Sequence, residues 1–166
     1  MALHPRFAEL AAQSQTMPPA GSIPAAELRA AVRRYSVRKE PFPVPLASVE
    51  DRTIDGPGGP LALRIYTPCG EGPFPLIVFC HGGGWVVGDL DTQDMIARAL
   101  AHAAGAVLVS VDYRLAPEHP FPAAPDDAWC ALNWAAGNAA SLNADPARLA
   151  VAGGVNSGVT LASGSA

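Results

Sequence analysis

Three short, mostly apolar runs recur along the second half of the chain: Leu76–Cys80, Val107–Val111 and Leu149–Ala152. Each has the length of a strand and lacks the strict apolar and polar alternation of a half-buried strand. This pattern is typical of strands that a parallel sheet buries on both faces. We therefore predict three buried strands of an α/β sheet.

The stretch between the first two runs has helical spacing. Thr92–Ala104 carries Ile96 and Leu100 on one face, and Asp91 or Thr92 is available as its N-cap. Gly105 follows directly, as expected of a residue that ends a helix in the left-handed region. We predict a helix that packs one face on the sheet.

A second helical stretch lies between the second and third runs, from about Pro125 to Ala136, and Gly137 closes it. We expect its buried face to consist of Trp129, Leu132 and Ala136. The order of elements is then βαβαβ with right-handed crossovers. The predicted fold class is α/β, with a mostly parallel sheet and helices on both faces.

The first part of the chain has a different pattern. Two helical stretches, Pro5–Gln13 and Pro24–Tyr35, are separated by proline and glycine. The segments Ser48–Ile54 and Leu61–Tyr66 alternate in polarity around Gly56-Pro57-Gly58-Gly59, which predicts a β-hairpin. We divide the chain into a helical appendage, residues 1–40, and an α/β core, residues 41–166.

Composition narrows the class of protein. The 166 residues are 49% hydrophobic and 16% charged with a net charge of −4, which predicts one globular core and no binding of nucleic acid. No apolar run approaches the roughly 20 residues of a spanning helix, and no secretory leader pattern opens the chain, so we expect a cytoplasmic protein without a membrane partner. The cysteines and histidines lack metal-ligand spacing, and the glycines lack nucleotide-binding spacing. We expect neither a metal nor a cofactor.

The run His81-Gly82-Gly83-Gly84-Trp85 follows the first buried strand directly. Acyl transfer develops negative charge on the carbonyl oxygen, and fixed backbone N–H groups stabilise that charge. Three consecutive glycines allow the backbone to approach a bound acyl group without an intervening Cβ. The run therefore predicts an oxyanion hole for ester chemistry, and a glycine-rich turn without a ligand is the alternative.

Together with this run, Asp89, Asp112-Tyr113-Arg114-Leu115-Ala116-Pro117-Glu118 and Pro122 resemble the hormone-sensitive-lipase family of α/β-hydrolase esterases. The resemblance implies that residues 1–40 form part of a cap over the active site and that Gly82 and Gly83 supply oxyanion donors. It also implies that residues 112–122 buttress the site. The residues expected to support the site structurally are His81, Gly84, Asp112, Arg114 and Glu118. We favour a structural ion pair between Arg114 and Glu118 over a substrate clamp.

The turn after the third run departs from the family pattern. A nucleophile elbow has the form G-x-S-x-G, and this chain has Gly154-Val155-Asn156-Ser157-Gly158. Both glycines are in place to support the turn, but Asn156 stands at the nucleophile position, and a carboxamide has no proton to give to a base. The resemblance implies that Ser157 adds a third oxyanion N–H. Ser157 is also the alternative nucleophile, although the side chains of Val155 and Val159 would crowd a shifted elbow.

No acid and no histidine follow Asn156 in the chain, whereas the triad of this fold runs Ser, then Asp or Glu, then His. We therefore expect a truncated and inactive N-terminal portion of a carboxylic ester hydrolase for short acyl esters. The alternatives are a non-catalytic protein that binds a small ester or acid, and a frame-shifted product without a selected function. The third strand would be exposed at the sheet edge, which predicts self-association.

Overall fold

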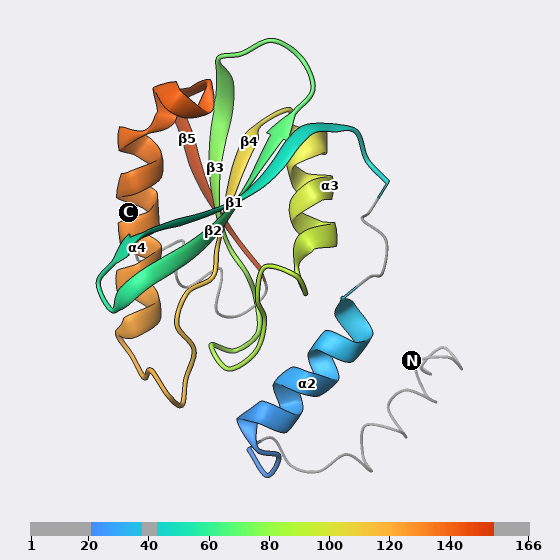
Figure 1. The fold of residues 1–166 in the computed structure, drawn as a ribbon, viewed down its shortest axis with the longest axis vertical. Coiled ribbons are helices and arrows are strands. Elements are labelled where there is room, and N and C mark those ends of the chain that lie inside the picture. Colours follow the sequence, from blue (N-terminus) through green and yellow to red (C-terminus); the bar gives the residue numbers. More distant parts are fainter. Residues whose placement is uncertain (1–20, 38–42, 155–166) are drawn as a thin grey trace, which may run out of the picture.

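The computed structural model describes residues 21–37 and 43–154, and these build a five-stranded mixed sheet in the order β1-β2-β4-β3-β5 (Figure 1). The strands are β1 (Leu46–Gly56), β2 (Gly59–Pro68), β3 (Phe74–Cys80), β4 (Val107–Val111) and β5 (Ala144–Gly153). The helices are α2 (Ala25–Ser36), α3 (Asp94–Ala104) and α4 (Ala123–Gly137), with a short 3-10 turn at Ala139–Leu142. The α/β fold class is confirmed.

All three predicted strands lie side by side in the parallel half of the sheet. β3 pairs with β4 on one edge and with β5 on the other, so that Val78 faces Val109 and Val151 in register. Each of the two crossovers carries a helix, α3 before β4 and α4 before β5. Parallel strands need such crossovers, because a tight turn reverses the chain direction.

The predicted hairpin is confirmed and is longer than expected. β1 and β2 pair antiparallel along their whole length, down to the Gly56 and Gly59 pair at the turn. β2 then joins the rest of the sheet through antiparallel pairing with β4, where Leu63 faces Val111. The sheet is mixed because the hairpin extends the parallel half at this edge.

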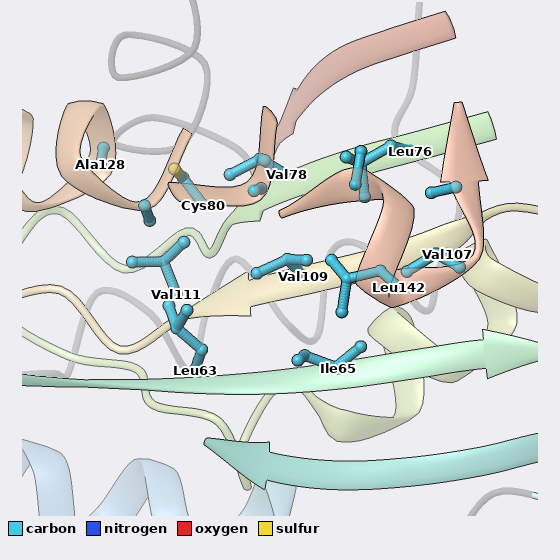
Figure 2. Close-up of a cluster of buried hydrophobic side chains, with 14 of the residues drawn as sticks. Leu63, Ile65, Leu76, Val78, Cys80, Val107, Val109, Val111, Ala128 and Leu142 are labelled. Atoms are coloured by element: carbon cyan, nitrogen blue, oxygen red, sulfur yellow. The ribbon is translucent and has the colours of Figure 1, made fainter. Parts of the chain in front are cut away.

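The two faces of the sheet carry separate apolar cores, and α4 and α3 cover opposite faces (Figure 1). On the α4 side, side chains from β2, β3 and β4 pack in rows (Figure 2). The expected buried face of α4 was wrong at Trp129, which is 52% exposed. Leu132 does pack against the core, but the fully buried positions are mostly small residues. The buried residues of α4 are Ala123, Ala124, Asp127, Ala128, Ala131 and Ala135. Alanines let the helix axis approach the sheet, whereas an indole on that face would hold it away.

α3 covers the other face, where Ala97 and Ala101 pack on Tyr66, Phe79 and Leu108. Gly105 ends the helix in the left-handed region, at φ 57°, as predicted. The N-cap prediction was wrong, because the helix begins at Asp94 and its cap residue Gln93 makes no side-chain capping bond. The polar turn before it is closed instead by reciprocal bonds between Asp89 and Thr92.

The predicted helix over residues 24–35 is observed as α2, and the one predicted at Pro5–Gln13 lies outside the described residues. α2 sits apart from the sheet, beside the loops at its lower end in Figure 1, and none of its residues is buried. The role of residues 1–40 as an appendage and part of a cap stays a prediction. Among the described residues, no helix is long and apolar enough to cross a membrane.

Candidate active site

Two glycine motifs meet at the carboxyl ends of the parallel strands. Cys80 at the end of β3 is in register with Gly153 at the end of β5, and the Gly154 N–H donates to the Cys80 carbonyl at 3.0 Å. A Cβ placed on Gly154 would lie 2.4 Å from the backbone nitrogen of Gly82. Only glycine fits there, so the chain after β5 lies directly against the start of the glycine run. Strand ends of this kind are the usual place for sites in open α/β sheets.

The glycine loop, residues 82–88, is a tight turn. The N–H groups of Val86 and Val87 both donate to the Gly83 carbonyl, at 3.2 and 3.1 Å. Gly83 has φ 143°, and a Cβ on it would lie 1.9 Å from the Val87 carbonyl oxygen. Trp85 adopts φ 60°, which is uncommon for a bulky residue. The turn therefore requires glycine at position 83 for space as well as for conformation.

Within the described residues, the backbone N–H groups of Gly82 and Gly83 have no hydrogen-bond acceptor. Unpaired N–H groups at a strand end are suited to bind an anionic oxygen. Gly84 is exposed at φ 60°, and a Cβ on it would meet nothing within 4 Å. The presence of glycine at position 84 is therefore explained by backbone conformation alone. The donor roles of Gly82 and Gly83 stay predictions.

His81 is fully buried under this loop. Its ring stacks on Tyr113 at 4.2 Å, and the Tyr113 hydroxyl donates to the His81 carbonyl at 2.6 Å. Gly88 packs so closely that a Cβ on it would lie 2.4 Å from the imidazole Nδ1. Burial lowers the pKa of His81, so the ring is neutral at pH 7. These contacts fit the structural role expected of His81.

Arg114 pairs with Asp127 and not with Glu118, so the expected ion pair was wrong. The guanidinium binds the Asp127 carboxylate through two bonds of 2.9 Å, and the Arg114 backbone N–H adds a third. Residues 112–119 follow β4 as an irregular loop, so the side chains of residues 114 and 118 do not share a helical face. Glu118 instead accepts two bonds from Arg29 of α2.

Asp127 and Arg29 are residues that the sequence analysis missed. Asp127 is 1% exposed on the alanine face of α4. A charged residue at helical spacing among small apolar ones was a signal, because a buried carboxylate needs a partner. Arg29 carried no such signal, since its contacts come from loops more than 50 residues away.

The carboxyl group of Asp112 lies at the junction of β4, the glycine loop and α2. Its surroundings are the carboxylates of Asp89 and Asp91 and the guanidinium groups of Arg33 and Arg64. Burial, together with the two nearby carboxylates, raises the pKa of Asp112 to about 6. Asp112 thus titrates close to neutral pH, and its supporting role in the site stays a prediction.

An apolar cavity of about 300 Å³ opens beside the glycine loop. Its lining residues are Gly84, Trp85, Ala116, His119, Pro120, Phe121, Ala124 and Pro125. Asn156, Ser157 and Gly158 lie outside the described residues, so their predicted roles are untested. In the part of the chain that is described, no three His, Cys, Asp or Glu side chains are grouped to hold a metal ion.

The chain is similar in sequence to known esterases. The family described as alpha/beta hydrolase fold matches residues 77–164. The carboxylesterase NlhH of Mycobacterium tuberculosis is 48% identical over 126 residues, which is 75% of this chain and 40% of that protein. The esterase LipI of the same species is 52% identical over 112 residues, covering 66% of this chain and 35% of LipI.

Solved esterase structures superpose on the whole chain. A hyperthermophilic esterase from the archaeon Pyrobaculum calidifontis matches with a TM-score of 0.82 and 38% identity, over all of this chain and 52% of its own. The ester hydrolase EH1AB1 from the Lake Arreo metagenome matches with a TM-score of 0.84 and 38% identity, over 99% of this chain and 54% of its own. The chain thus spans about half of these solved structures and less of the curated relatives.

Proposed function

The chain belongs to the alpha/beta hydrolase family, in its hormone-sensitive-lipase-like branch, and from this premise we propose that it carries the oxyanion-binding part of a site for hydrolysis of carboxylic esters with short acyl groups. One observation carries the proposal: Gly154 lies against Gly82, which brings the glycine loop to the start of the elbow. An attacking group and the donors for the resulting oxyanion must lie within about 3 Å of one reacting carbon. The contact between Gly154 and Gly82 supports that proximity.

The proposed chemistry is acyl transfer through a tetrahedral intermediate. The oxyanion would accept hydrogen bonds from the N–H groups of Gly82, Gly83 and Ser157. A serine at the elbow would attack, but this chain has Asn156 there, whose carboxamide has no proton to give to a base. Residues 157–166 contain no acid and no histidine. We infer that residues 1–166 by themselves stabilise an oxyanion but do not turn over an ester.

The size of the substrate is inferred from the cavity beside the loop. At about 300 Å³, with a lining of alanine, proline and aromatic side chains, it suits a short apolar group. Gly84 and Trp85 line both the cavity and the glycine loop, so a group in the cavity would be next to the scissile carbonyl. This supports a short acyl or alkoxy group rather than a long lipid chain.

The test combines turnover with binding. The 166-residue polypeptide and its Asn156→Ser variant are incubated with 4-nitrophenyl butyrate, and binding of butylphosphonate, a charged mimic of the tetrahedral intermediate, is measured by calorimetry. We expect no turnover by either polypeptide and binding of butylphosphonate, with no binding of the neutral control 1-butanol. Turnover by the unmodified chain would contradict its inferred inactivity. Equal binding of butanol and butylphosphonate, or of neither, would contradict the oxyanion site.

A second candidate is a binding protein on a hydrolase scaffold. The specific observation in its favour is that Gly154 and Gly158 are kept while Asn156 replaces the nucleophile. Such a protein would hold a small ester or acid intact. It is distinguished by saturable binding of ethyl butyrate that leaves the ester unchanged after hours of incubation. An oxyanion-binding site of an esterase would instead bind the charged mimic more tightly than the ester, because its N–H donors complement the transition state.

A further inference from the structure

The contact between α2 and the core is made by arginine side chains. Arg29 Nε donates to the Val86 carbonyl at 2.7 Å, and its Nη2 donates to the Ala116 carbonyl at 2.8 Å. The same guanidinium forms two bonds to the Glu118 carboxylate, at 2.9 and 2.7 Å. One turn later, Arg33 pairs with the carboxylates of Asp89 and Asp91. One side chain of α2 therefore contacts both the glycine loop and the loop after β4.

The bond to Val86 acts on the glycine loop through a rigid peptide group. The Val86 carbonyl and the Val87 N–H belong to one planar peptide unit, so fixing the oxygen also fixes the hydrogen. That N–H donates to the Gly83 carbonyl at 3.1 Å. The Gly83 carbonyl in turn shares its plane with the Gly84 N–H. The guanidinium thus polarises and orients a chain of hydrogen bonds that ends at the carbonyl of Gly83, the residue whose own N–H is a predicted oxyanion donor.

A second bond prevents the loop from moving as a unit. The Ala116 N–H donates to the Trp85 carbonyl at 2.8 Å, while the Ala116 carbonyl accepts from Arg29. The Arg29 guanidinium links α2 to the carbonyls of Val86 and Ala116. Trp85 and Ala116 are also bonded to each other directly. Rotation of the turn would break bonds on both sides of Arg29.

We propose that Arg29 is a positioning residue for the oxyanion hole, so that docking of α2 and ordering of the glycine loop are one event. The proposal rests on the function proposed for that loop. Because α2 buries no side chain, its docking depends on partly exposed charge pairs: the Arg29 and Glu118 side chains are 27% and 52% exposed. Such pairs are weakened by salt. Ionic strength therefore controls the order of the loop through α2.

The test follows hydrogen exchange of the Val86 and Val87 amides by NMR in the 166-residue chain. Arg29→Gln should speed their exchange by about tenfold, while the Leu108 and Val109 amides in the central strand β4 stay unchanged. In the unmodified chain, raising sodium chloride from about 0.05 M to about 0.5 M should speed exchange in α2 and at Val86 and Val87 together. The salt series needs no variant to fold.

Two variants serve as controls. Arg34 lies on the same helix, and no partner of its side chain is found among the described residues, so Arg34→Gln should leave the loop amides unchanged. Glu118→Gln removes the carboxylate but leaves the two carbonyl bonds, and it should change loop exchange less than Arg29→Gln does. An equal effect of Arg34→Gln would overturn the proposal, as would loop amides that ignore both Arg29→Gln and salt.

The outcome is independent of ester chemistry. If butylphosphonate fails to bind while Arg29→Gln still speeds exchange in the glycine loop, the proposed function is wrong and the coupling between α2 and the loop stands. If butylphosphonate binds and the loop amides ignore Arg29, the function stands and the coupling is wrong.

Discussion

At the scale of single residues, two glycines and one partly buried ion pair fix the backbone around the glycine loop and the loop after β4. The need for glycine at positions 83 and 154 follows from a motif, and the structure explains it by contacts that no Cβ could fit. The partner of Arg114 could not be predicted, because Asp127 reaches it only through the path of the loop after β4. Side-chain pairing across a loop depends on tertiary structure, whereas a left-handed turn is encoded locally.

Asp112 leads to a prediction about how stability depends on pH, with a sign opposite to that of a carboxyl group whose pKa is lowered by folding. Its pKa in the folded chain, about 6, is above the ordinary value of a carboxyl group in the unfolded chain. Its contribution to stability is therefore fully present below about pH 4 and is lost as the pH rises through 6. Asp112→Asn should stabilise the fold by about 1–3 kcal/mol at pH 7.5 and by little at pH 4.

Urea denaturation at the two pH values measures the effect, and Asp126→Asn, at an exposed position of α4, is the matched control. A gain from Asp112→Asn that is equal at both pH values would show that ionisation of Asp112 is not the cause.

Asp127 leads to a second prediction. Asp127→Ala leaves the Arg114 guanidinium and its backbone N–H without their carboxylate acceptor, in a site where Asp127 itself is buried. Breaking a fully buried pair on one side costs about 3–5 kcal/mol, and the partial exposure of Arg114 places the expected loss below that range, at about 2–3 kcal/mol. The midpoint of urea unfolding measures it.

The Asp145 and Arg148 pair at the surface is the control, since Asp145→Ala should leave the midpoint unchanged. Equal losses from the two alanine variants would mean that burial of the Arg114 pair contributes nothing.

At the scale of elements, apolar runs of strand length predicted β3, β4 and β5. The expected burial is found in β4 and in most of β3, whereas most positions of β5 are intermediate or exposed. The buried face of α4 could not be predicted from hydrophobicity, since Trp129 is exposed while most of the fully buried positions are alanines. How closely a helix approaches a sheet depends on the volume of its facing side chains. Hydrophobicity scales do not measure side-chain volume. At α4, close packing on the sheet requires small side chains.

The alanine face of α4 gives a prediction of its own. Ala131 is fully buried against the sheet, while Ala140 in the neighbouring 3-10 turn is exposed. Ala131→Leu should destabilise the fold by about 1–3 kcal/mol, because added methyl groups force the helix away from β3 and β4. Thermal unfolding measures this, with Ala140→Leu as the control. Unchanged melting of Ala131→Leu would show that the contact between helix and sheet has spare room.

At the scale of the whole molecule, β5 lies at the edge of the described sheet, where it pairs with β3 alone. An unpaired strand edge offers backbone donors and acceptors to another chain. We therefore expect the 166-residue polypeptide to self-associate as its concentration rises. Ala150 is exposed on β5, and Ala150→Lys should shift the population toward monomer by placing a charge at that edge.

Light scattering after size-exclusion chromatography, with Ala140→Lys as the control, measures this association. If the unmodified chain stays monomeric at the highest concentration, the expected self-association is contradicted. Equal effects of Ala150→Lys and Ala140→Lys on the monomer population would contradict the role of the β5 edge.

The central claim is that the glycine loop presents N–H groups for an oxyanion. The most direct measurement is an NMR titration of the ¹⁵N-labelled 166-residue chain with butylphosphonate. The account predicts saturable downfield shifts of the Gly82 and Gly83 amide protons, with no change at the distant turn residue Gly56 and none with 1-butanol. Saturable shifts elsewhere that leave Gly82 and Gly83 unmoved would contradict it.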